Sequence, residues 1–461
     1  MSDKESIGEG AASLQSIRRS LQELSLNSVR KVLPDRAIVS ACRAVGLEWR
    51  ERKIPPIVVV LHMVLAALWP EKSFAASWQT IWAGLASHLP GAAGLSPGPG
   101  AVSKARSRLP LEVWEQLFAW LSDRAQELAE EAGDRWRGLR LVLIDGFTVS
   151  MPDKPELFEA FGRARGKHGP YKYPLARVVV MVLANSLNVI GYRLGRYHDS
   201  ENALAEELQP DLRSGDLLIG DRRFAGAHYY AAYLARGVQF LTRVHQCLKL
   251  DRLLRSQVLG PGDFLTSLRL NEVYRRAHPE LPKSVTVRLI QVEARVRGKR
   301  QLFWLVTSLL DAKLYPASEV AELYSRRWRI ETLIEEIKIG LGADVLRSLT
   351  PEGVRKEFAA RMLATNVMRS IMLEAAMKHG VDPLRISFKT TLRTVLVFAP
   401  ALGNAPIWRL PAVYQAMLQE IASQLVPRRP GRNEPRCIRR ELQHYPYLRM
   451  SRAEWRRLHA S

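Results

Sequence analysis

Two short apolar runs in the chain each lead into an aspartate. Residues 141–144 (LVLI) precede Asp145, and residues 217–219 (LLI) precede Gly220 and Asp221. Continuous runs of this length are typical of strands that are buried on both faces. One aspartate after a strand most often belongs to a turn or a helix cap, although a buried carboxylate is costly unless it is paired or holds a metal. The repetition of the arrangement favours a functional site.

A third stretch, residues 324–338 (YSRRWRIETLIEEIK), has the apolar spacing of a single helix. At about 100° per residue, four polar side chains fall within an arc of roughly 60° on one face of that helix. They are Tyr324, Arg327, Glu331 and Lys338. A solvent-exposed helix also carries charges of both signs, so this face alone leaves that interpretation open. With the two aspartates, however, the helix completes a set of three carboxylates, which suits hard divalent cations.

The pattern between these stretches predicts a core in which strands and helices alternate. A strand is expected at residues 140–148, and two strands joined near residues 185–188 are expected within residues 177–197. The elements that follow are a helix at 201–208, a strand at 217–221, a helix at 226–237 and a strand at 238–245. Three strands followed by alternation indicate an α/β core.

The segments on either side of this core have other patterns. Residues 34–90 have helical spacing and include an apolar helix at 56–69, in which His62 is expected to be a core histidine. Residues 246–317 interrupt the alternation of the core, and within them residues 284–309 alternate with period two around a predicted turn at Gly298–Lys299. We therefore expect an inserted β subdomain at 246–317, because the gap of 331 − 221 = 110 residues between the second and third carboxylates is too long for one connection. Residues 355–395 again predict helix, and a basic segment broken by proline follows.

The charge of the chain limits its partners. Its 461 residues, enough for two to four domains, carry a net charge of +22, which indicates a polyanionic partner such as nucleic acid or an acidic membrane. The apolar run at 56–69 is too short to span a bilayer and the N-terminus is polar, so nucleic acid is favoured. The three cysteines are far apart and include no C-x-x-C pair, which argues against disulfides or a zinc ribbon and fits a reducing cytoplasm.

Two basic segments are candidates for contact with DNA. The first follows the SPGPG loop at 96–100 and lies near the start of a predicted helix, where contact with DNA and simple solvent exposure are both open. The second is the loop 162–173, which lacks the spacing of a phosphate loop but combines basic residues with tyrosines. The residues expected to contact DNA are Lys104, Arg106, Arg163, Arg165 and Lys167.

The carboxylate motifs together resemble those of the DDE transposases of bacterial insertion sequences, specifically the insertion-sequence-four group. That group has a Tyr-(2)-Arg-(3)-Glu-(6)-Lys signature, which the helix at 324–338 matches at every spacing. The IDGFT run around Asp145 and the GDRRF run around Asp221 resemble the first and second acidic motifs. Spacing on the helix does not separate Glu331 from Glu335, but the signature selects Glu331. The resemblance extends over roughly residues 40–400.

The resemblance implies a DNA transposase that binds transposon ends and catalyses metal-dependent strand cleavage and strand transfer by a cut-and-paste route. Asp145, Asp221 and Glu331 would be the catalytic residues and would hold Mg²⁺, with Mn²⁺ as a substitute and two ions in the site. Trp304 has the pattern of a core aromatic, whereas the resemblance implies that it stacks on a base flipped out near the cleaved end and so helps to close a DNA hairpin. The residues expected to contact DNA around the site are Tyr324, Arg327, Lys338, Trp304 and Arg222.

The expected fold is an α/β ribonuclease H-like core with an inserted β subdomain, preceded by a helical domain and followed by a helical, basic region; a generic doubly wound sheet is the alternative. The expected domains are 1–135 (helical, DNA-binding), 136–245 (first part of the core), 246–317 (β insertion), 318–400 (second part of the core, with Glu331) and 401–461 (basic C-terminal region).

The expected partners are double-stranded DNA with terminal inverted repeats and target DNA, bound by a homodimer in the bacterial cytoplasm at the nucleoid, without a membrane. Two other functions remain open at this stage. The same core could belong to a metal-dependent nuclease that does not join strands. The chain could also be a catalytically inactive, transposon-derived DNA-binding protein.

Overall fold

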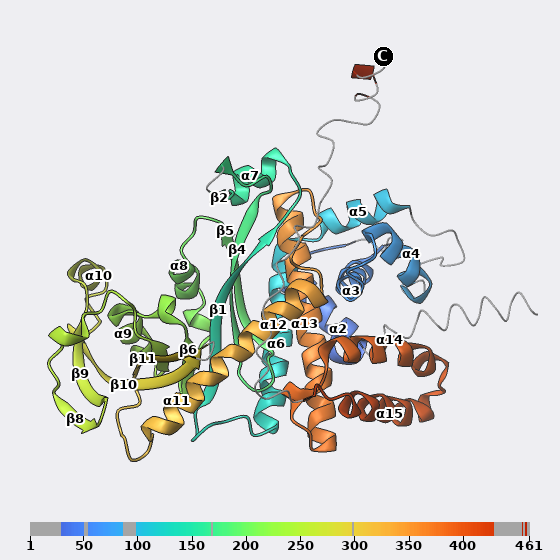
Figure 1. Cartoon of the computed structure of the whole chain (residues 1–461). Helices are drawn as coiled ribbons and strands as arrows, with labels where there is room; N and C mark the ends of the chain where they lie inside the picture. The colour runs from blue at the N-terminus through green and yellow to red at the C-terminus, as the bar shows by residue number, and fades with distance from the viewer. Residues whose placement is uncertain are drawn as a thin grey trace, which may run out of the picture.

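The computed structural model describes residues 29–49, 54–85, 98–166, 169–296 and 299–427, with Glu454, Arg457 and Leu458. Figure 1 shows a central sheet and a large group of helices beside it, to which both the N-terminal and the C-terminal parts of the chain contribute. The predicted basic segment after residue 427 lies almost entirely outside the described residues.

Helices form the N-terminal region, as the spacing of residues 34–90 predicts. The apolar helix begins at Pro56, where a proline is tolerated because the first-turn N–H has no partner within the helix. His62 is 1% exposed, which confirms that it is a core histidine. The helices are α2 (Asp35–Ala44), α3 (Pro56–Ala67), α4 (Phe74–Leu85), α5 (Pro99–Arg108) and α6 (Leu111–Glu131).

Contrary to the prediction from the sequence, the basic segment around Lys104 does not lie near the start of a helix. It belongs to α5, which ends at Arg108, and the longer helix α6 begins only after Leu109 and Pro110. A residue before proline is disfavoured in the helical region, and Leu109 is accordingly extended, with ψ of 115°. Lys104 and Arg106 therefore lie in the second half of a separate short helix.

Within the described residues, nine strands form one mixed sheet in the order β5-β4-β1-β6-β7-β11-β10-β9-β8. β1, β6 and β7 are parallel neighbours, and the other pairs are antiparallel. The strands are β1 (Arg140–Ser150), β4 (Leu175–Leu183), β5 (Val189–Arg196), β6 (Asp216–Gly220), β7 (Gln239–Arg243), β8 (Gln257–Gly260), β9 (Asp263–Arg269), β10 (Ser284–Val296) and β11 (Lys299–Thr307). The strands predicted between residues 140 and 245 are thus confirmed.

The two faces of the sheet are covered by different helices. Leu141 and Leu143 of β1 point into the larger core with α3, α6 and α13 (Pro351–His379), whereas Val142 and Ile144 point into a smaller core with α8 (Glu201–Glu206) and α9 (Ala227–Ala235). Side chains alternate along a strand. Asp145, which follows Ile144, therefore lies on the face of the larger core, and Gly146 faces α8.

The predicted β structure of residues 246–317 is present as an extension of the central sheet. β10 and β11 form the expected antiparallel pair, and β11 pairs in turn with β7 through Leu305 and Arg243. The turn predicted at Gly298–Lys299 lies partly outside the described residues. Smaller elements are α7 (Pro155–Phe161), α10 (Glu272–Ala277) and the two-stranded hairpin of β2 (Arg165–Gly166) and β3 (Gly169–Pro170).

The segment 324–338 is helical, but it is not the single regular helix that the sequence suggests. It passes from α11 (Ala317–Ser325) through a 3₁₀ turn (Arg326–Trp328) into α12 (Arg329–Glu335) and ends in a π turn (Glu336–Gly340). These turns have different numbers of residues per turn, so a uniform step of 100° does not hold along the segment.

Three C-terminal helices complete the larger core. α13 (Pro351–His379) is buried along most of its length, and Gly380 ends it in the left-handed conformation. α14 (Phe388–Asn404) and α15 (Leu410–Ser423) lie side by side at one edge of the molecule (Figure 1). The predicted helix at 355–395 is thus confirmed, divided between α13 and α14. None of the described helices is long and apolar enough to cross a membrane.

Candidate active site

Asp145 and Asp221 lie side by side at one edge of the sheet. β1 and β6 pair in parallel, with Leu143 opposite Ile219. The same register, continued for two residues, aligns Asp145 with Asp221, which follows the last residue of β6. Because adjacent strands are ~4.8 Å apart, the two aspartates belong to one site.

The Asp145 carboxyl group is largely enclosed by protein. Its Oδ1 accepts a hydrogen bond of 2.8 Å from the backbone N–H of Gly146, and its Oδ2 lies 3.5 Å from Nη1 of Arg327. Burial raises the pKa of Asp145 to about 6; the Gly146 N–H and Arg327 oppose this rise, while Asp221 and Glu331 add to it. The three carboxylates therefore act on one another as members of one site.

Arg327 links the helical segment 324–338 to β1. Its Nη2 lies 3.4 Å from Oε1 of Glu331, so one guanidinium faces both Glu331 and Asp145. Tyr324, one turn earlier, is 8% exposed; burial raises its pKa, with Arg327 opposing the rise and Asp221 adding to it. The structure thus brings together five of the residues that the sequence placed at the site.

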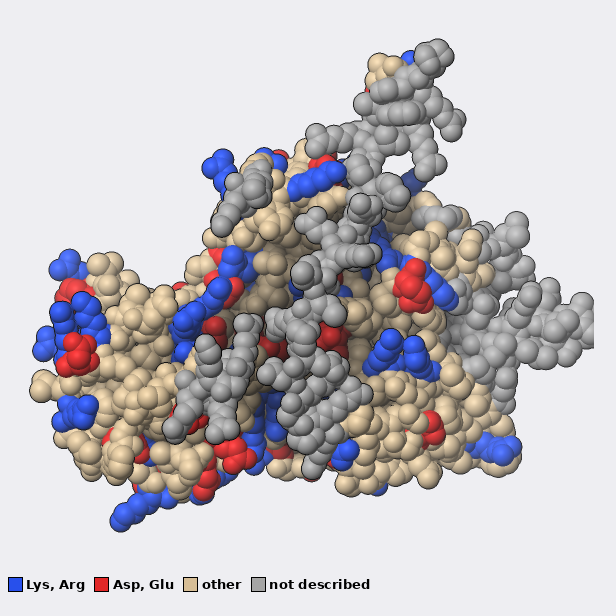
Figure 2. Space-filling view, viewed as in Figure 1, with Lys and Arg blue, Asp and Glu red and all other residues tan. Residues whose placement is uncertain are grey.

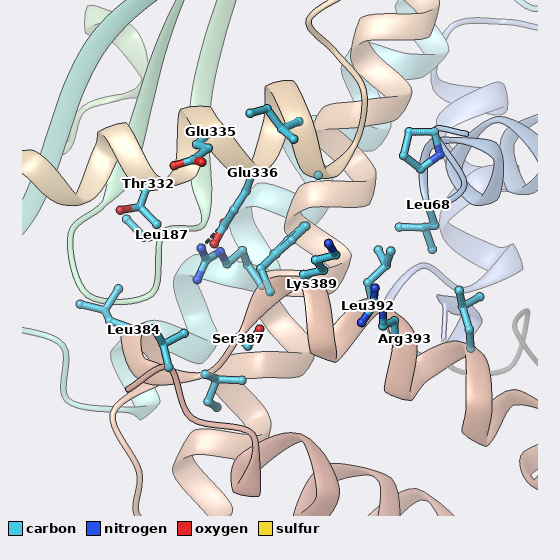
Figure 3. A pocket seen from close by; sticks show the side chains of 18 of the residues that line it. Leu68, Leu187, Thr332, Glu335, Glu336, Leu384, Ser387, Lys389, Leu392 and Arg393 are labelled. Atoms are coloured by element: carbon cyan, nitrogen blue, oxygen red, sulfur yellow. Dashed lines mark hydrogen bonds and ion pairs between the residues drawn. The ribbon is translucent and has the colours of Figure 1, made fainter. Parts of the chain in front are cut away.

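Glu335 points elsewhere. Together with Glu336 it lines a cavity of about 930 Å³ between α12, α13 and α14, in which Glu336 pairs with Arg369. Figure 3 shows both glutamates at this cavity with Thr332, while Glu331 is not one of its lining residues. The geometry therefore supports Glu331 as the third carboxylate.

Lys338 is not brought to the carboxylates. Its Nζ pairs with Asp344 Oδ1 at 3.1 Å, and the backbone oxygen of Asp344 accepts a hydrogen bond from Ser150 N at 2.9 Å. Ser150 lies ~17 Å beyond Asp145 at the usual rise of a strand. Lys338 therefore stands further along β1.

Trp304 lies on the opposite side of the sheet from Tyr324. It packs with the smaller core, where its ring is 5.6 Å from that of Phe264. The neighbouring Phe303 faces the helical segment 324–338 instead, with its ring 6.1 Å from the ring of Tyr324 and the guanidinium of Arg243 5.0 Å above it. Because side chains alternate along a strand, Phe303 and Trp304 lie on opposite faces of β11, and it is Phe303 that lies on the face near Tyr324.

The predicted DNA-contacting cations have different surroundings. Lys104 and Arg222 are exposed, whereas Arg106 packs 4.5 Å above the ring of Phe74, and burial lowers its pKa while Glu357 opposes that change. Arg106 is therefore turned inward. Arg163 and Arg165 are exposed and line a cavity of about 910 Å³ beside α7. Lys167 lies outside the described residues.

Glu201 is a fourth carboxylate near the site. The sequence predicted only that it would begin a helix, and it was not a candidate site residue. Its side chain lies against Gly146, and its Oε1 accepts hydrogen bonds from Arg177 and Arg223. These contacts depend on the pairing of β1, β4 and β6. No spacing within the sequence could have indicated them.

The donor groups of the site suit a hard divalent cation, since they are carboxylates alone. The described residues contain no set of three His, Cys, Asp or Glu side chains close enough to enclose a metal as they stand. Asp145 and Glu331 face Arg327 instead. Because Asp221 and Glu331 still contribute to the raised pKa of Asp145, the site holds more negative charge than Arg327 balances, and a divalent cation fits this excess.

Comparisons with known proteins agree with these features. The family model of the transposase DDE domain matches residues 136–367, and that of the insertion element 4 transposase N-terminal region matches residues 23–119. The chain is 30% identical to the Escherichia coli K12 transposase InsG for insertion sequence element IS4, over 76% of this chain and 78% of that protein. It is 25% identical to the Escherichia coli transposase for insertion sequence element IS421, over 60% of this chain and 83% of that protein.

These matches define the chain as a transposase, an enzyme that cleaves DNA and transfers the cut strands. It belongs to the DDE transposases of the IS4 family. The expected signature at residues 324–338 thus led to the correct family.

Proposed function

We propose that this transposase performs cut-and-paste transposition with Asp145, Asp221 and Glu331 as its catalytic carboxylates. The alignment of Asp145 with Asp221 across β1 and β6 supports this most directly. Glu331 joins them through its contact with Arg327. The three carboxylates would hold two divalent ions, Mg²⁺ in the cell and Mn²⁺ as a substitute.

Bound divalent ions would activate a water or a DNA 3′-hydroxyl and stabilise the leaving oxygen. The side chains of the protein bind and orient the DNA around this reaction. Arg327 has planar donors close to both carboxylates, so it is placed to donate to an oxygen of the scissile phosphate. Burial keeps the Tyr324 hydroxyl protonated, and it remains a hydrogen-bond donor. Lys338 would meet a phosphate further along the duplex.

The DNA surface that we propose extends beyond the carboxylates. Figure 2 shows Lys and Arg side chains around α7 at the top of the molecule and around α10 at the left. Exposed Lys104, Arg163, Arg165 and Arg222 are the candidate phosphate contacts, and the net charge of +22 supports such a role. The inward position of Arg106 makes it the weakest candidate.

The core that we propose is ribonuclease H-like, with the antiparallel strands β5, β4 and β1 followed by the parallel strands β6 and β7. The strand order and directions support this assignment over a wholly parallel doubly wound sheet. The proposed domains keep the boundaries 1–135, 136–245, 246–317, 318–400 and 401–461. A transposon has two ends and each chain offers one such site, so we expect a homodimer on the DNA, acting at the bacterial nucleoid.

A strand-transfer assay tests this function. The substrate is a plasmid that carries the coding region with its flanking DNA on both sides, incubated with the protein, Mg²⁺ and target DNA. The proposal predicts joined product. A cut product without joining would indicate a nuclease, and the absence of both products, with DNA binding retained, would indicate an inactive DNA-binding protein.

A further inference from the structure

Behind the candidate active site, one partly buried carboxylate connects the segments that carry both aspartates. Glu201 begins α8, and its side chain is 13% exposed. Its Oε1 accepts hydrogen bonds of 2.9 Å from Nη1 of Arg177 on β4 and 3.0 Å from Nη1 of Arg223. Arg223 also donates its backbone N–H to Oδ1 of Asp221 at 2.7 Å. Arg223 therefore connects the side chain of Glu201 to the carboxylate of Asp221.

The same glutamate lies directly against β1. A Cβ placed on Gly146 would approach Cδ of Glu201 to 2.9 Å and its Cγ to 3.1 Å, so any larger residue at this position would displace the glutamate. The backbone N–H of Gly146 donates to the Asp145 carboxylate. Since adjacent side chains point to opposite faces of a strand, Asp145 faces the helical segment 324–338 while Glu201 supports the strand from behind.

A local role in α8 does not explain these contacts. Ser200 already caps the helix, with its Oγ accepting a hydrogen bond of 3.0 Å from Ala203 N. An acidic residue in the first turn of a helix is favourable without partners on other elements. Burial of a carboxylate is costly unless it is paired, and both of the cations that pair with Glu201 come from the segments around the active site.

We infer that Glu201 is a positioning residue for the metal site. Through Arg223 it fixes the turn that presents Asp221, and through Gly146 it fixes the part of β1 that presents Asp145. This rests on the proposed role of both aspartates as metal ligands. Groups that orient metal-ligating side chains typically change metal affinity by about 10–100-fold when they are removed. Loss of the contact between Glu201 and Arg223 should have an effect of this size.

The test is Mn²⁺ binding to the full-length protein without DNA, measured from the electron paramagnetic resonance signal of unbound Mn²⁺. Arg223→Ala is the sharper variant, because Arg223 is 63% exposed and its loss leaves the pair of Glu201 with Arg177 in place. Its apparent Kd should rise about 10–100-fold with an unchanged melting temperature. Glu201→Gln should weaken binding similarly, and the double variant should be little weaker than either, because both changes remove one contact.

Two control variants break comparable ion pairs away from the site. Glu207→Gln alters the exposed partner of Arg193, 3.6 Å away, and Arg213→Ala alters the partner of Asp123, 2.8 Å away. Both should bind Mn²⁺ like the wild type. If Asp145→Asn abolishes binding but the Arg223 and Glu201 variants bind normally, the positioning role is overturned alone. If the wild type binds no more tightly than Asp145→Asn, the proposed metal site fails as well.

Discussion

Replacing Phe303 should impair DNA processing more than replacing Trp304. Phe303 is the aromatic residue of β11 that faces the helical segment 324–338, with its ring near Tyr324 and below the guanidinium of Arg243. Tyr324 in turn lies within the electrostatic reach of Asp221. A base that leaves the duplex beside the carboxylates would therefore meet Phe303, whereas Trp304 packs on the other side of the sheet.

The size of the effect follows from the stacking energy. Stacking of a base on an aromatic ring contributes about 1–3 kcal/mol, which corresponds to roughly 5–150-fold at 1.4 kcal/mol for each factor of ten. Phe303 is only partly buried. Phe303→Leu keeps an apolar side chain against the core, so it should cost less than the about 3–5 kcal/mol of truncating a buried phenylalanine. The variant should fold, make the first nick normally and form hairpin product about 5–150-fold more slowly.

The assay uses a pre-nicked duplex from the DNA that flanks the coding region, with products separated on a denaturing gel. Trp304→Leu is the matched control: it should lower the melting temperature through its lost packing on Phe264 but leave the hairpin yield unchanged. Normal hairpin yield with Phe303→Leu, and reduced yield with Trp304→Leu, would refute this reasoning. A reaction that never forms a hairpin would refute it too.

Three further predictions concern stability, thiol reactivity and DNA affinity. Burial lowers the pKa of His62 from 6.5 to about 3, so below pH 6.5 the unfolded chain takes up a proton at this residue that the folded chain does not; the contribution of His62 to the free energy of unfolding should fall by about 2 kcal/mol at pH 5. Urea denaturation at pH 7 and pH 5 should show a loss that is larger in the wild type than in His62→Gln by this amount; equal losses in both proteins would exclude an effect of His62. Thiol labelling of the native protein should modify exposed Cys247 and spare Cys42, whose pKa burial raises to about 11, and equal rates would contradict its burial. Log K for DNA should fall against log salt by about 0.9 for each phosphate neutralised; Arg163→Ala should reduce the slope by about 1, and an unchanged slope would remove Arg163 from the DNA surface.

The sequence predicted the elements of the core because their signals are local. Each strand of the core is a short apolar run bounded by polar or turn residues, and the residues of the Tyr-Arg-Glu-Lys signature lie on one continuous helical segment. Spacing along the helix predicted that Arg327 and Glu331 would lie together. It did not predict the 3₁₀ and π turns, and Lys338 lies in the π turn, where it pairs with Asp344.

The remaining features depend on contacts between distant segments. Whether Phe303 or Trp304 faces the candidate active site depends on which face of β11 meets the helical segment 324–338. A shift of one residue along the strand would reverse the two positions. The contact of Glu201 with Gly146 exists only because α8 packs on β1. Likewise, the division of α5 from α6 at Pro110 turns Arg106 toward Phe74. A single sequence does not contain these pairings in a local pattern.

The most direct test of the account compares Glu331→Gln with Glu335→Gln in Mg²⁺-dependent cleavage of the DNA ends. The two glutamates lie one turn apart on α12, but Glu331 contacts Arg327, which also faces Asp145, while Glu335 lines the cavity between α12, α13 and α14. Both substitutions keep the size of the side chain and remove its charge. We expect Glu331→Gln to abolish cleavage while DNA binding persists, and Glu335→Gln to cleave like the wild type. Full cleavage by Glu331→Gln, or loss of cleavage confined to Glu335→Gln, would contradict the proposed active site.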